Sequence, residues 1–141
     1  MENRRRGNAA LKSQIGVALT LLLLGGTASA SWVPFGIGNA NFTNYVDHGT
    51  IVRNGNTVRM WNLVDFKKTN SIAGKSVLSM KMEREYDCQK DQSRDIFLSF
   101  HSKNMGEGEM LSSQKFSDAA WVPNPPGKAD EAVWKDACGK K

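Results

Sequence analysis

Two cysteines, Cys88 and Cys138, are the feature that most restricts the folds open to this chain. No third cysteine is present, so one intramolecular disulfide between them is the default in an oxidising compartment. Closing a loop of about 50 residues stabilises a protein by about 4 kcal/mol in the chain-entropy model. That is a large share of the roughly 5–15 kcal/mol that holds a small domain folded. We therefore expect a disulfide between Cys88 and Cys138 that ties two distant segments together.

The sequence gives less support to two other roles for the thiols, catalysis and zinc binding. A catalytic thiol needs a base, and the two histidines, His48 and His101, do not lie in a recognisable nucleophile motif. A structural zinc site needs four ligands at short local spacings, which this cysteine pair lacks. Mass spectrometry of non-reduced peptides distinguishes these roles, because only a bridged pair gives a linked peptide.

The first thirty residues indicate export to an oxidising compartment. A positively charged start (Arg4, Arg5, Arg6 and Lys12) precedes an apolar run at residues 15–24 and the small-residue pattern "ASA" that ends at Ala30. The run is shorter than the roughly 20 residues that span a bilayer. We expect a signal peptide at residues 1–30, cleaved after Ala30, followed by one domain at residues 31–141.

No cysteine lies beside this cleavage site to carry a lipid. We therefore expect a soluble exported protein, in the periplasm, at the cell surface or secreted, with no transmembrane anchor in the mature chain. Removing four basic residues and Glu2 with the leader reduces 19 Lys+Arg and 14 Asp+Glu to 15 and 13. The mature chain has no long basic run, so nucleic-acid binding is not expected.

The segment "KSVLSMKMEREYDC" at residues 75–88 admits a strand or a helix. Apolar side chains alternate with polar ones along it, which fits a half-buried strand. Leu78, Met82 and Tyr86 also recur at helical spacing among good helix formers. We favour the strand, because five apolar positions follow the alternation: Leu78, Met80, Met82, Tyr86 and Cys88.

Further strands are expected on both sides of this segment. "TVRMWNLVDF" at residues 57–66 is rich in Val, Trp, Leu and Phe, which is typical of a central strand. The tight-turn sequence Asn54-Gly55-Asn56 predicts a hairpin between this strand and residues 51–53. We also expect short strands at residues 31–38, on an edge because of Pro34, and at residues 43–49. Polar and apolar residues alternate again at residues 93–102, which predicts another strand, and residues 89–92 are expected to form the hairpin loop before it. A last strand is expected at residues 111–116.

A terminal helix is expected in "KADEAVWKDACGKK", after the breaking run "PNPPG". Asp130 and Glu131 suit its first turn, and Gly139 suits its C-terminal cap. Such a short helix is marginal alone in water and needs a surface to pack on. A Cys88–Cys138 bond would clamp it against the sheet. The apolar side chains that share one face are Val133, Trp134, Ala137 and Cys138.

With these motifs in order, the chain resembles the surface-adhesin E family of small exported bacterial proteins. The resemblance is carried by Trp32, "YVDHGTIVRNGNTVRMWNLVDF", Ser76, "EREYDC", "GEGE", "WVPNPPG" and "EAVWKDAC". It implies an α+β fold: a single antiparallel sheet of about six strands with a C-terminal helix clamped on one face by a disulfide. It also implies attachment to host extracellular-matrix or serum proteins.

No catalytic, metal or cofactor site is expected from the remaining polar residues, and ligand-binding residues are not identified. His48 and His101 are expected at the surface or in turns. Glu83, Glu85 and Asp87 share one face of their strand and are expected to be solvated. The four tryptophans are expected to pack the core: Trp32, Trp61, Trp121 and Trp134.

Two functions follow as hypotheses. One is an adhesin-like binding protein, and the other is a soluble periplasmic accessory or envelope-stress protein with no host ligand. An enzyme is not expected, since no nucleophile, paired base or metal constellation is present. A homodimer through the edge strands of the sheet is compatible with either function.

Overall fold

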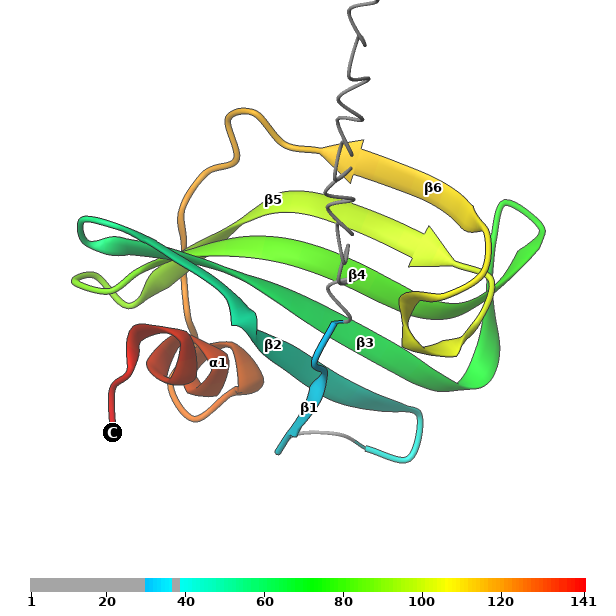
Figure 1. Ribbon diagram of the computed structural model, residues 1–141, viewed down its shortest axis with the longest axis horizontal. Coiled ribbons are helices and arrows are strands. Elements are labelled where there is room, and N and C mark those ends of the chain that lie inside the picture. The colour runs from blue at the N-terminus through cyan, green and yellow to red at the C-terminus, as the bar shows by residue number, and fades with distance from the viewer. Residues whose placement is uncertain (1–29, 37–38) are drawn as a thin grey trace, which may run out of the picture.

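The computed structural model describes residues 30–36 and 39–141, so the expected signal peptide falls almost wholly outside the described residues. Its domain is an antiparallel sheet with one C-terminal helix, as expected (Figure 1). The strands are β1 (Val33–Phe35), β2 (Phe42–Asn54), β3 (Thr57–Ile72), β4 (Lys75–Asp87), β5 (Gln92–His101), β6 (Met110–Lys115) and β7 (Val122–Pro123). The helices are the short 3₁₀ helix η1 (Asn104–Gly106) and α1 (Ala129–Cys138).

The strands form a meander in which each pairs with the one before it, in the order β1-β2-β3-β4-β5-β6. The two-residue β7 is the seventh strand and pairs with the start of β5. The sequence did not indicate β7, because Pro123 cannot donate a ladder hydrogen bond. Asn124 continues the pairing by donating its backbone N–H to the carbonyl of Asp91 (3.0 Å).

The ambiguous segment is a strand over Lys75–Asp87, with Cys88 in the turn that follows, and the helical alternative is wrong. β4 pairs with β3 on one side and β5 on the other, which makes it a central strand. Its backbone hydrogen bonds are therefore satisfied along both edges, and this tertiary pairing outweighs the helix preference of Met, Lys, Glu and Arg.

β2 differs from expectation. The segments 43–49 and 51–53, expected as separate strands, are parts of one strand that is interrupted by a bulge between Asp47 and Val52. The hydroxyl of Thr50 bridges the irregularity, donating to the Asp47 carbonyl (2.6 Å) and accepting the N–H of Trp61 (3.0 Å). The expected hairpin does form, and Gly55 takes the positive φ of 58° that its tight turn requires.

The principal core lies between α1 and one face of the sheet, which we call the helix face. Buried Val46, Val58, Met60 and Tyr86 project from the strands onto Trp134 and Ala137 of the helix. Successive side chains point to opposite faces of a strand, so the neighbours of these residues lie on the opposite face. The apolar side of α1 inferred from its spacing is thus the side that packs.

The opposite face is covered in part by the β5–β6 connection, which carries η1. In Figure 1 this connection lies at the end of the sheet away from α1. Its backbone is held by two side chains of the sheet: Asp65 accepts the N–H of Met105 (2.7 Å), and Ser79 accepts that of Gly106 (2.9 Å). Gly106 has a positive φ of 73°, and a Cβ on it would lie 2.5 Å from the Lys81 side chain, so both its backbone and its neighbour favour glycine.

Candidate functional site

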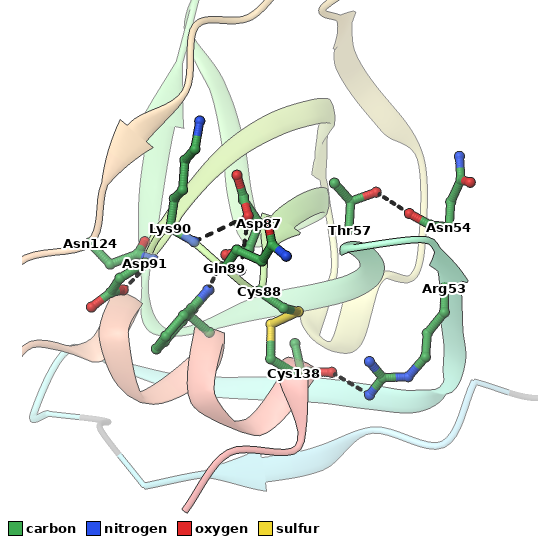
Figure 2. Close-up of a disulfide and its surroundings, with 12 residues drawn as sticks. Arg53, Asn54, Thr57, Asp87, Cys88, Gln89, Lys90, Asp91, Asn124 and Cys138 are labelled. Atoms are coloured by element: carbon green, nitrogen blue, oxygen red, sulfur yellow. Dashed lines mark hydrogen bonds between the residues drawn. A yellow bond between two sulfur atoms is a disulfide. The ribbon is translucent and has the colours of Figure 1, made fainter.

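The expected disulfide is present and joins the turn after β4 to the last residue of α1 (Figure 2). The Cα atoms of Cys88 and Cys138 are 5.6 Å apart, within the usual range for a disulfide. The bond therefore clamps α1 to the sheet, as the sequence indicated. It is a structural element and leaves no free thiol among the described residues.

Polar contacts reinforce the seat of the helix near this bond. The indole N–H of Trp134 donates to the carbonyl of Asp87 (2.7 Å). The side chain of Arg53, labelled in Figure 2, donates to the carbonyl of Ala137 (3.3 Å). His48 pairs with Asp136 of the helix (2.7 Å). Three side-chain contacts thus fix the same segment that the disulfide ties.

A buried tyrosine lies beneath the helix. The hydroxyl of Tyr86 accepts a hydrogen bond from the side-chain amide of Asn62 (2.9 Å). Burial disfavours the phenolate and raises the pKa of Tyr86 to about 12. Tyr86 is therefore a neutral core residue at physiological pH.

The acidic cluster of β4 is not uniformly solvated, which corrects the expectation for Glu85. Glu83, Glu85 and Asp87 do share one face, but the Glu85 side chain is only 6% exposed. Its two carboxylate oxygens bind Arg59 (3.1 Å) and Arg94 (2.5 Å). The guanidinium of Arg94 in turn lies 4.4 Å from the ring centre of Trp121. This arrangement is a paired, structural carboxylate, because both oxygens are engaged by arginines.

The two histidines differ in their exposure to solvent. His48 is exposed, as expected, whereas His101 is buried on the opposite face, which contradicts the expectation of a surface or turn position. Its Nε2 lies 3.0 Å from the Ser99 hydroxyl. Burial, with a smaller contribution from the charge of Lys81, lowers the pKa of His101 below its usual value. The neutral imidazole is therefore a core group.

The four tryptophans also differ in how far they are buried. Trp134 is buried in the core, but Trp32, Trp61 and Trp121 are only partly buried, so the expectation of core packing is wrong for these three. The ring of Trp61 packs edge-on against Phe97, with 5.8 Å between centres. Two of the partly buried rings, those of Trp32 and Trp61, line one pocket.

This aromatic pocket is the candidate binding site. It has a volume of about 310 Å³ and is open to solvent on the opposite face of the sheet. Elements β2, β3 and β4 supply three of its walls, and the segment before β1 supplies the fourth. We define it by its lining residues: Ala30, Ser31, Trp32, Asp47, Gly49, Thr50, Trp61 and Lys81.

Charge in the aromatic pocket comes from two residues on β2 and β4, the strands on either side of β3. Lys81 places its ammonium 5.4 Å from the ring centre of Trp61, a cation–π contact. Asp47 accepts hydrogen bonds from the backbone N–H groups of Gly49 (3.0 Å) and Ser31 (3.1 Å). The pocket can therefore take an apolar or aromatic group and surround it with one charge of each sign. The sequence did not indicate it, since the bulge that brings Asp47 and Thr50 together is not visible in the residue pattern.

Neither a metal cluster nor a membrane-spanning helix is found in the described part of the chain. Within it, no group of three or more His, Cys, Asp and Glu side chains could hold a metal ion. No helix within residues 30–36 and 39–141 is long and apolar enough to cross a bilayer.

Comparison with known proteins gives one family and one fold. The family model described as surface-adhesin protein E matches residues 32–139. A crystal form of Haemophilus influenzae protein E superposes with a TM-score of 0.58 at 12% identity, covering 76% of this chain and 94% of that one. Protein E from non-typeable Haemophilus influenzae superposes with a TM-score of 0.52 at 12% identity, covering 79% and 83%. No curated protein matches the sequence.

Proposed function

Because this chain belongs to the surface-adhesin protein E family, we propose that it is an exported binding protein of the bacterial envelope that attaches to host extracellular-matrix or serum proteins. The observation that carries the proposal is the family match over residues 32–139, which includes the sheet, α1 and both cysteines. The family description, surface-adhesin protein E, supports attachment as the class of function. The fold shared with protein E supports a sheet with a C-terminal helix as the framework for it.

We place the contact with the partner at the aromatic pocket. Tryptophan is enriched among residues that dominate protein–protein binding, because a large ring buried in a pocket excludes water from neighbouring contacts. Trp32 and Trp61 offer two such rings around a solvent-open hollow, with Lys81 beside them. A partner side chain of aromatic or aliphatic character would fit between the rings.

The proposal describes binding without a reaction. In the aromatic pocket the polar groups already have protein partners: Asp47 accepts two backbone N–H groups, and the hydroxyl of Thr50 donates to a carbonyl. Both side chains therefore hold the backbone that forms the pocket wall, a structural role that general-base or nucleophilic chemistry does not require. These contacts favour a static recognition surface over a catalytic one.

A binding assay tests the proposal directly. Purified chain starting at Ser31 should bind at least one immobilised matrix or serum protein saturably, and Trp32→Ala should weaken that binding at least about tenfold, as for a hot-spot residue. Val122→Ala is the matched control, since Val122 is an exposed apolar residue on β7 and does not line the pocket. Equal weakening by both variants would remove the pocket from the proposal.

Cell fractionation separates the proposal from its alternative, a soluble periplasmic accessory protein. An adhesin should be detected at the cell surface by antibody on intact cells. Protein found wholly in the periplasm, together with no saturable binding to any matrix or serum protein, would support the accessory role and reject attachment.

Self-association through an edge strand belongs to the same proposal. β6 is an outer strand of the meander and carries exposed Met110, whereas β1 on the other edge is short and contains Pro34. Pairing between two β6 strands is therefore the favoured route to a homodimer. Light scattering at increasing concentration should show twice the monomer mass if this pairing occurs.

A further inference from the structure

Asp47 is a buried carboxylate with no cationic partner among the described residues. The residue is 4% exposed, and within that part of the chain its two oxygens accept the backbone N–H groups of Gly49 and Ser31. Lys81 lines the same pocket, but its ammonium lies over the Trp61 ring. Within the described residues no Lys, Arg or His side chain forms an ion pair with Asp47. A buried charge without a counter-charge is costly, which raises the question of what neutralises it.

The residue that contacts Asp47 from the N-terminal side is the one that cleavage would expose. Ser31 donates its peptide N–H to the Asp47 Oδ2 atom at 3.1 Å. Cleavage after Ala30 would consume one water molecule, leave a carboxylate on Ala30 and leave an amine on Ser31. A free α-amine has a pKa of roughly 7.7–8.0 and is therefore mostly protonated at neutral pH. The same nitrogen would then carry a positive charge.

We propose that Asp47 is a binding site for an α-ammonium group, and that its occupant is the N-terminus created at Ser31 by removal of the signal peptide. The neutral N–H···O bond of the precursor becomes a charge-assisted bond, which is stronger. Ala30 leaves the wall of the aromatic pocket in the same step, so the pocket opens as the ion pair forms. The proposal depends on the expected cleavage after Ala30 and is independent of any host ligand.

The ion pair would fix the start of the domain. Ser31 and Trp32 directly precede β1, an edge strand of three residues that pairs only with β2. A strand this short has few ladder hydrogen bonds and frays readily. An ammonium held by Asp47 of β2 adds a contact at its free end. It thereby positions the Trp32 ring in the wall of the pocket.

Three versions of the purified chain isolate the charge. The first begins with a free amine at Ser31, the second is the same chain acetylated at the Ser31 amine, and the third retains Ala30 as an extra first residue. The acetylated chain keeps the N–H donor and loses only the positive charge. At pH 6 we expect the free-amine chain to melt about 4 °C or more above the acetylated chain, the shift typical of one moderate interaction in a domain of this size. Equal melting temperatures would overturn the proposal.

A double-mutant cycle assigns the effect to Asp47. In Asp47→Asn the difference between free and acetylated chains should disappear. In Asp87→Asn, the control, it should persist, because Asp87 caps the turn after β4 and does not line the pocket. A difference that survives in Asp47→Asn contradicts the assignment.

Titration of the amine gives a readout that does not need the Asp47 variant to fold. Asp47 from β2 and Lys81 from β4 are the charged groups lining the pocket, and the carboxylate is the one in direct contact. We expect the pKa of the Ser31 amine to lie above the usual 7.7–8.0, measured by the pH dependence of reductive methylation. A raised pKa stabilises the fold below pH 7.7, and that stability is lost as pH rises through the new value. An unshifted amine, or an exported protein that begins at another residue by N-terminal sequencing, would refute the proposal.

Discussion

At the scale of single residues, the opposite face of the sheet is governed by buried carboxylates. Glu85 and Asp47 are both nearly inaccessible to solvent, but they are neutralised differently. Glu85 has arginines from both neighbouring strands, β3 and β5. Within residues 30–36 and 39–141, Asp47 is bonded by backbone amides and by no cation. A polar position in an alternating strand therefore does not imply a solvated one.

Glu85→Gln should destabilise the fold by about 1–2 kcal/mol. The change removes the negative charge that Arg59 and Arg94 share. The expected loss of stability is smaller than for a fully buried ion pair, because both arginines are partly exposed to solvent. Urea unfolding measures the loss. Glu83→Gln is the matched control on the same face and should change stability by less than about 0.5 kcal/mol. Equal effects from both changes would indicate that strand propensity, and not the arginine pairing, is responsible.

Tyr86 should make the protein sensitive to alkali. The pKa of Tyr86 is raised to about 12 by burial, so above pH 10 the unfolded chain releases this proton before the folded one does. Stability due to the neutral phenol is present below pH 10 and is lost as pH rises towards 12. Tyr86→Phe should flatten this alkaline decline by up to about 3 kcal/mol, the equivalent of two pKa units. Denaturation at pH 9 and pH 11.5 measures the change, and an unchanged slope would show that other groups control alkaline unfolding.

At the scale of elements, α1 depends on the sheet. Ten residues make a helix of about 15 Å, which is too short to be stable alone. Its stability comes from Trp134 and Ala137 in the core, from the contacts of Arg53 and His48, and from the disulfide.

Replacement of both cysteines by serine should release the helix before the sheet. The chain-entropy model gives a loss of about 4 kcal/mol for a loop of this length. We expect a lower melting temperature and partial loss of helical circular dichroism, with the strand signal retained. Reduction of the wild-type chain by dithiothreitol is the control and should reproduce both changes. A fully native spectrum in the reduced protein would mean that the apolar contacts alone hold α1.

At the scale of the whole molecule, the meander concentrates stability in its middle. β3 and β4 are long strands and have a paired neighbour along both edges, whereas β1 and β6 lie on the outside. Strands of this kind open only with global unfolding.

Amide hydrogen exchange should follow this order. The slowest amides are expected at the paired residues of β3 and β4, such as Met60 and Tyr86, and the fastest at β1 and β7. Native-state exchange followed by NMR or mass spectrometry measures the exchange rate of each backbone amide. Equal protection of edge and central strands would show that the sheet unfolds as one unit.

Much of this architecture was predictable from the sequence, and the reasons differ by feature. Alternation located β4 and β5, the Gly55 turn located the first long hairpin, and the cysteine pair with the Trp134 spacing located the clamped helix. These signals are local, or depend on a single long-range bond. The bulge in β2, the burial of Glu85 and His101, and the aromatic pocket depend on which side chains meet across several strands. No one segment encodes them.

The serial order of the meander has a consequence for how the molecule is completed. A chain delivered across a membrane from its amino end can pair its strands in the order in which they arrive, since each strand joins the one before it. Cys138 is delivered after all seven strands of the described sheet, whereas Cys88 is delivered directly after β4. Oxidation of this pair can therefore take place only after the described strands have been delivered, so a chain truncated before Cys138 would carry a free thiol at Cys88.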